Sequence, residues 1–108
     1  MNKVYSIDEI KTIIAPIATR HRLNRVYLFG SYANGNASHH SDIDFCVDVP
    51  ENTGLFELGG LYIDLKDAFN KEIDVITINS LKNNKNPKFV TNVNKENILI
   101  YEDDGKRC

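Results

Sequence analysis

The sequence has few cysteines, no excess of basic residues and no apolar run of membrane-spanning length. Its two cysteines, Cys46 and Cys108, lie far apart, which argues against a disulfide framework and is typical of a reducing cytoplasm. Thirteen basic and 15 acidic residues leave a formal net charge of −2, whereas proteins that bind duplex nucleic acid usually carry a clear basic excess. No segment has the length of a transmembrane helix, and the N-terminus lacks the apolar region of a signal peptide. We therefore expect a cytoplasmic protein that binds neither a membrane nor duplex nucleic acid.

What the chain does contain is typical of one globular domain. It has 108 residues, of which 42% are apolar and 26% are charged, and it shows no internal repeat or low-complexity tract. The last apolar run ends at Tyr101, and the residues after it are mostly charged. We expect a domain spanning residues 1–101 and a flexible C-terminal tail at residues 102–108.

The apolar periodicity predicts helices that alternate with short strands. Ser6 and Glu9 form a capping-box pattern ahead of isoleucines at helical spacing, which predicts a helix from residue 7 to about 20. A second helix is predicted over about residues 54–70. Gly59 and Gly60 weaken its middle, and close packing against the sheet would compensate for them. The remaining predictions are a short helix near residues 89–93 and strands at residues 25–29, 42–49, 73–78 and 98–101.

Three aspartates follow a glycine–serine pair in a pattern that indicates chemistry. Asp42 and Asp44 are one residue apart at the start of a predicted strand, so both side chains point to the same face. Two carboxylates that close repel each other, and a hard divalent cation would hold them together. Asp74 interrupts another apolar strand, and pairing of the strands would place it beside the first two. Upstream, Gly30-Ser31 ends the first strand where the backbone can approach a ligand closely.

This arrangement resembles the nucleotidyltransferase superfamily typified by DNA polymerase beta, and the short length resembles its minimal nucleotidyltransferase (MNT) branch. The resemblance implies an α/β fold in which a small mixed sheet is backed by helices. It implies that Asp42, Asp44 and Asp74 bind two Mg²⁺ ions and form the catalytic site. It also implies that Gly30, Ser31 and the residue at position 34 bind the nucleotide. Relatives often have arginine at that position, and Asn34 here lacks the positive charge, for which Lys66, Lys71 or a basic residue of a partner could substitute.

The function implied by the resemblance is transfer of AMP from ATP, with loss of pyrophosphate. MNT proteins resemble antitoxins that modify a tyrosine of a HEPN-domain toxin, so the resemblance implies a HEPN toxin as partner and substrate. A first alternative is an antitoxin that neutralises its partner by binding alone. A second is transfer to a small molecule, which needs a pocket that this short chain is not expected to build alone.

Overall fold

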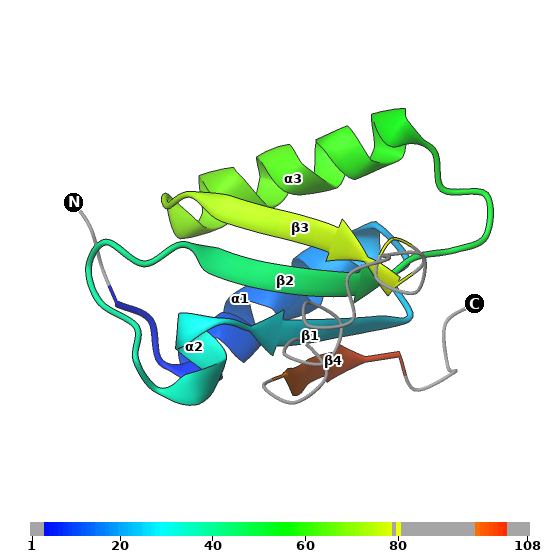
Figure 1. The fold of residues 1–108 in the computed structure, drawn as a ribbon. Helices are drawn as coiled ribbons and strands as arrows, with labels where there is room; N and C mark the ends of the chain where they lie inside the picture. The colour runs from blue at the N-terminus through cyan, green and yellow to red at the C-terminus, as the bar shows by residue number, and fades with distance from the viewer. Residues whose placement is uncertain (1–3, 79, 81–96, 104–108) are drawn as a thin grey trace.

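A computed structural model describes residues 4–78, 80 and 97–103. Its elements follow the order α1 (Ile7–Arg20), β1 (Arg25–Phe29), α2 (Ser31–Asn34), β2 (Ile43–Asp48), α3 (Leu55–Phe69), β3 (Ile73–Thr77) and β4 (Ile98–Glu102). The strands form one sheet in the order β3-β2-β1-β4 (Figure 1). β2 pairs parallel with β3, and β1 pairs antiparallel with both β2 and β4. The sheet is therefore mixed, as predicted.

The predicted elements agree closely with these bounds. The Ser6 hydroxyl accepts a hydrogen bond from the Glu9 N–H at 3.0 Å, and the Glu9 carboxylate accepts one from the Ser6 N–H at 2.9 Å, so the capping box is confirmed. The second predicted helix and the four predicted strands are present within one or two residues of their expected ends. The short helix predicted near residues 89–93 lies outside the described residues. No described helix has both the length and the apolar composition needed to cross a membrane.

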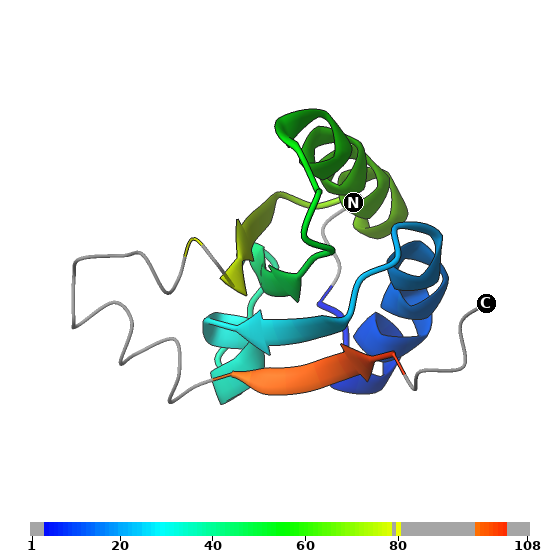
Figure 2. The same cartoon turned by 90° about the vertical axis from the view of Figure 1, so that its right-hand side faces the viewer.

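The two long helices cover one face of the sheet, and the hydrophobic core lies between these layers (Figure 2). Alternate side chains of β1 and β2 point into this core, while the residues between them lie on the open face. The buried core side chains include Ile10, Ile14, Val26, Leu28, Ile43, Phe45, Val47, Leu61, Leu65 and Phe69. Because every second residue of β2 is fixed by the core, the residues in between are fixed on the opposite face.

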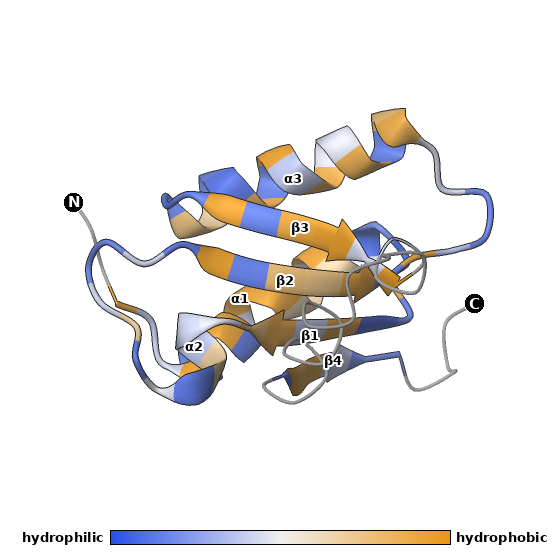
Figure 3. Ribbon diagram, viewed as in Figure 1, coloured by the Kyte–Doolittle hydropathy of each residue, from blue (hydrophilic) through white to orange (hydrophobic). Residues whose placement is uncertain are grey.

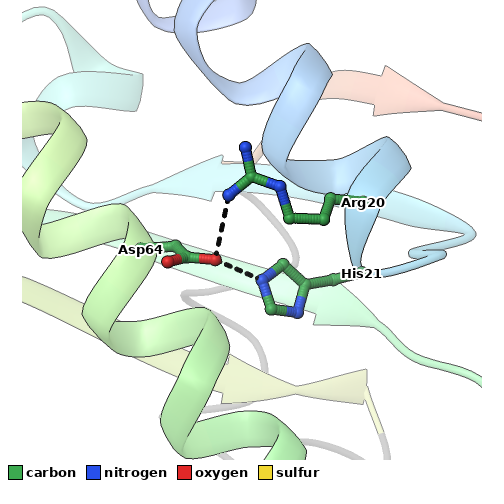
Figure 4. Close-up of polar contacts among 3 residues, drawn as sticks. All are labelled: Arg20, His21 and Asp64. Atoms are coloured by element: carbon green, nitrogen blue, oxygen red, sulfur yellow. Dashed lines mark hydrogen bonds and ion pairs between the residues drawn. The ribbon is translucent and has the colours of Figure 1, made fainter.

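Polar contacts join the two long helices at the end of α1. His21 Nε2 lies 2.6 Å from Asp64 Oδ2 on α3, and Arg20 donates to the same oxygen at 3.3 Å (Figure 4). The hydrogen bond from His21 is the main reason that the pKa of Asp64 is lowered. These contacts lie on the helical layer, on the opposite side of the sheet from the open face.

Candidate active site

Strand pairing brings Asp44 and Asp74 together on the open face of the sheet. Asp44 lies between the buried residues Ile43 and Phe45, so its side chain points away from the core. In the parallel pairing of β2 with β3, Asp44 is directly opposite Asp74. Two of the three predicted carboxylates are therefore neighbours on adjacent strands.

The electrostatic environment of Asp44 disfavours its ionised form. Burial, a hydrogen bond with Asp74 and the negative charges of Asp74 and Asp42 together raise the pKa of Asp44 to about 7. Two carboxylates that share a hydrogen bond cannot both ionise without a strong electrostatic penalty. Hard oxygen donors with unfavourable mutual charge suit a divalent cation such as Mg²⁺, which would compensate that charge. The chemistry of this donor pair thus fits the predicted metal.

Gly30 supports the position of the Asp44 carboxylate. Its backbone has φ 74° and ψ −150°, a conformation that is essentially restricted to glycine. A Cβ atom at this position would overlap the Oδ2 atom of Asp44. The sequence suggested that Gly30 allows close approach of a ligand; in the structure, its bare side accommodates the carboxylate itself.

Asp42 lies outside the strands, unlike the other two carboxylates. It precedes β2 by one residue and, like Asp74, is exposed, and its charge contributes to the raised pKa of Asp44. Within the described part of the chain, no three aspartate, glutamate, histidine or cysteine side chains converge closely enough to hold a metal ion. The role of Asp42 as a metal ligand therefore remains a prediction.

The predicted nucleotide-binding residues occupy the turn between β1 and β2. Ser31 begins the one-turn helix α2, and Asn34 ends it. Asn34 is exposed, and its Oδ1 atom accepts a hydrogen bond from the Asn36 N–H at 3.1 Å. This contact stabilises the local turn. Binding of nucleotide by Gly30, Ser31 and Asn34 stays a prediction.

Lys71 fixes the loop that leads to the carboxylates. Its Nζ atom donates to the His39 carbonyl oxygen at 3.1 Å, and the residue is only 8% exposed. Lys66, by contrast, is exposed and pairs with Glu72 at 3.4 Å. The sequence suggested either lysine as a substitute for the charge missing at Asn34. The structure instead shows Lys71 tying the start of β3 to the loop before Asp42, a contact between distant residues that no local pattern reveals.

We expect Lys71→Met to weaken binding of ATP with Mn²⁺ by roughly tenfold, or about 1.4 kcal/mol. Methionine keeps an apolar stem in the buried site but cannot hold the His39 carbonyl, so the loop that carries Asp42 loses an anchor. Calorimetric titration measures the change. Lys66→Met is the matched control and should bind as the wild type does, because an exposed ion pair contributes little. Equal affinities for both variants would contradict this role of Lys71.

The chain matches a family model and a named relative over most of its length. The model for the family "Polymerase beta, Nucleotidyltransferase" matches residues 11–106. A protein of Methanocaldococcus jannaschii that is named a protein adenylyltransferase is 41% identical over 76 residues, which are 70% of this chain and 82% of that protein. The chain therefore belongs to the polymerase beta nucleotidyltransferase family, and its class of activity is nucleotidyl transfer.

Solved structures with the same fold include two toxin–antitoxin complexes. A chain of a complex with AMP-PNP has a TM-score of 0.69 at 21% identity, over 87% of this chain and 74% of that chain. A chain from the complex of a tri-AMPylated Shewanella oneidensis HEPN toxin with an MNT antitoxin has a TM-score of 0.65 at 18% identity, over 90% of this chain and 73% of that chain. This likeness confirms the predicted α/β nucleotidyltransferase fold.

Proposed function

We propose that this chain is an antitoxin that transfers AMP from ATP to a tyrosine hydroxyl of a HEPN-family toxin. The observation that carries the proposal is the Asp44–Asp74 pair, in which Asp44 lies against Gly30, in a chain of the nucleotidyltransferase family. The named relative supports adenylyl transfer to a protein. The two complexes support ATP as the donor and a HEPN toxin as the partner.

In the proposed reaction, the tyrosine oxygen attacks the α-phosphorus of ATP. A new P–O bond forms, the bond from the α-phosphorus to the bridging oxygen breaks, and pyrophosphate leaves with that oxygen. Asp74 is assigned as the group at or near which the hydroxyl proton is accepted. Gly30 and Ser31 are assigned to hold the outgoing pyrophosphate.

Asp42, Asp44 and Asp74 are the residues that would hold Mg²⁺. When bound, Mg²⁺ neutralises phosphate charge and increases the reactivity of the attacking oxygen. The protein's own contribution is to keep Asp44 and Asp74 side by side and to orient the nucleotide, because phosphoryl-type transfer depends mainly on positioning and charge stabilisation.

One observation favours a second candidate, an antitoxin that acts by binding alone. Asn34 is uncharged at the position where the family resemblance implies an arginine, so the site lacks a positive charge that would bind phosphate. A weakened site would still leave the surface that contacts the toxin. Incubation of the purified HEPN partner with this protein and labelled ATP distinguishes the two: label on the partner supports the enzyme, and neutralisation without label supports the binder.

The isolated protein should be stabilised by ATP with Mn²⁺. At one hundred times the dissociation constant, a ligand specific for the folded state contributes about 2.7 kcal/mol, which for a domain of this size raises the Tm by about 10 °C. Thermal denaturation with Mn²⁺, ATP, both or neither measures this effect. An unchanged Tm at saturating concentrations of both would refute the proposed metal–nucleotide site.

A further inference from the structure

The helix α3 is apolar on its outward face as well as on the face that packs against the core. Leu55, Phe56 and Ile63 are 87%, 91% and 59% exposed, and the apolar residues along α3 are visible in Figure 3. The opposite side of the helix buries Leu61, Leu65 and Phe69. A helix that carries apolar residues on two opposite faces, one of them exposed, is typical of one covered on both sides.

Gly59 lies in the middle of this outward face. It follows Leu55 by four residues and precedes Ile63 by four, so these residues are neighbours on the helix surface. A Cβ atom at Gly59 would meet no other atom within 4 Å. The sequence-based expectation that Gly59 packs against the sheet is therefore wrong. Gly60 approaches the end of α1 instead of the sheet, with 3.9 Å from its Cβ position to His21 Cε1.

A glycine in an exposed helix interior reduces helix stability without improving packing in this chain. It does allow the backbone of another element to approach closely. Together with the flanking Leu55, Phe56 and Ile63, Gly59 forms a surface suited to a second helix. We name these four residues the α3 outer face.

Negative charges lie beyond both ends of the α3 outer face. Glu51 precedes it and Asp67 follows it by one turn, and both are exposed. Neither has an ion pair among the described residues, whereas nearby Lys66 is paired with Glu72. In a two-fold pair of copies with antiparallel α3 helices, Glu51 of each copy would face Asp67 of the other. Like charges would then meet at both ends, which disfavours self-association through this face.

We propose that the α3 outer face is the docking surface for an amphipathic helix of the toxin partner, with an apolar side and Lys or Arg at both ends. This inference rests on the proposed function for the existence of such a partner. Phe56 is 13 residues before Phe69. The ring centroid of Phe69 lies 5.7 Å from that of Phe45, the residue that follows Asp44 in β2. At 1.5 Å per residue, Phe56 is about 20 Å along the helix from that end. Partner binding and chemistry thus use separate parts of the chain.

The test measures the affinity of this protein for its HEPN-family toxin partner, the existence of which is part of the proposed function, using calorimetric titration. The double variant Phe56→Ser with Ile63→Ser should bind at least 100-fold more weakly. Both side chains are exposed, so the fold should be retained, as circular dichroism and the Tm will show. Leu99→Ser, which alters an exposed apolar residue of β4, is the matched control and should bind within twofold of the wild type.

Gly59→Ala gives the most specific result, because a structural role and a docking role predict opposite outcomes for it. Alanine is the better helix former, and the site has open space, so the Tm of the free protein should rise. Binding to the partner should nevertheless weaken about tenfold, because the added methyl group prevents close approach. Glu51→Lys with Asp67→Lys should also weaken binding and reverse its dependence on salt.

Three outcomes would overturn the proposal. They are a wild-type protein that does not bind the HEPN-family partner, variants of the α3 outer face that bind the partner as well as the wild type does, or a wild-type dimer that Phe56→Ser dissociates. Binding of ATP with Mn²⁺ to the isolated protein is scored separately, and the α3 variants should leave it unchanged. If the wild type does not bind ATP with Mn²⁺, that result counts against the proposed enzyme. If it binds ATP normally and the α3 variants bind the partner as well as the wild type does, that result counts against the docking surface alone.

Discussion

Replacing Asp44 by asparagine is expected to abolish nucleotidyl transfer while leaving the protein folded. Asparagine has nearly the same shape, so the contact with Gly30 and the neighbouring position of Asp74 are retained. It removes a carboxylate whose pKa is raised to about 7 by burial, by its hydrogen bond with Asp74 and by nearby negative charge. The Tm without metal should therefore not fall, because an amide can donate to Asp74 without adding charge.

The loss of activity should exceed the roughly 10–100-fold that changes around a metal's ligands typically cause, because Asp44 is assigned as a ligand itself. The assay follows labelled AMP on the HEPN partner. A second measurement, the increase in Tm with Mn²⁺ and ATP, should also disappear, and it does not depend on any acceptor. The matched control is Asp48→Asn, because Asp48 lies on the same face of β2 but contacts Arg25 at 3.8 Å instead. If Asp44→Asn transfers AMP at the rate of Asp48→Asn, Asp44 is not part of the site.

Local signals in the sequence were sufficient to predict most of the fold. The capping box at Ser6 and the isoleucine spacing fix both ends of α1. The alternation around Asp44 places it on the open face once Ile43 and Phe45 are in the core. These features depend on side chains a few residues apart, so they can be read from one segment at a time.

The site was predictable only where the strand pairing could be anticipated. Resemblance to a family supplied the expectation that Asp74 joins Asp44, and the parallel register confirms it. The bond from Lys71 to His39 joins residues 32 positions apart and depends on how the loop folds, which the sequence pattern does not specify. The solvent exposure of Gly59 was likewise unpredictable, because an apolar pattern on both sides of a helix does not show which side the core will cover.

Gly30→Ala is expected to reduce both stability and transfer, and Gly35→Ala only stability. Both glycines have positive φ, 74° and 82°, so alanine is strained at either position. The strain costs about 1–3 kcal/mol at Gly30, in its glycine-only conformation, and about 1–2 kcal/mol at the left-handed Gly35. At Gly30 the new methyl group would also overlap Asp44 Oδ2, whereas at Gly35 it would meet no atom within 4 Å.

Displacement of the Asp44 carboxylate should therefore make Gly30→Ala inactive in AMP transfer and unresponsive to Mn²⁺ with ATP. Gly35→Ala should retain both properties at a lowered Tm. A double-mutant cycle with Asp44→Ala isolates the contact, because that change removes the carboxylate that the methyl group would overlap. In this background Gly30→Ala should cost only its backbone strain, a smaller loss of unfolding free energy than in the wild type. Equal losses in the two backgrounds would mean that Gly30 is required for its backbone conformation alone and does not position Asp44.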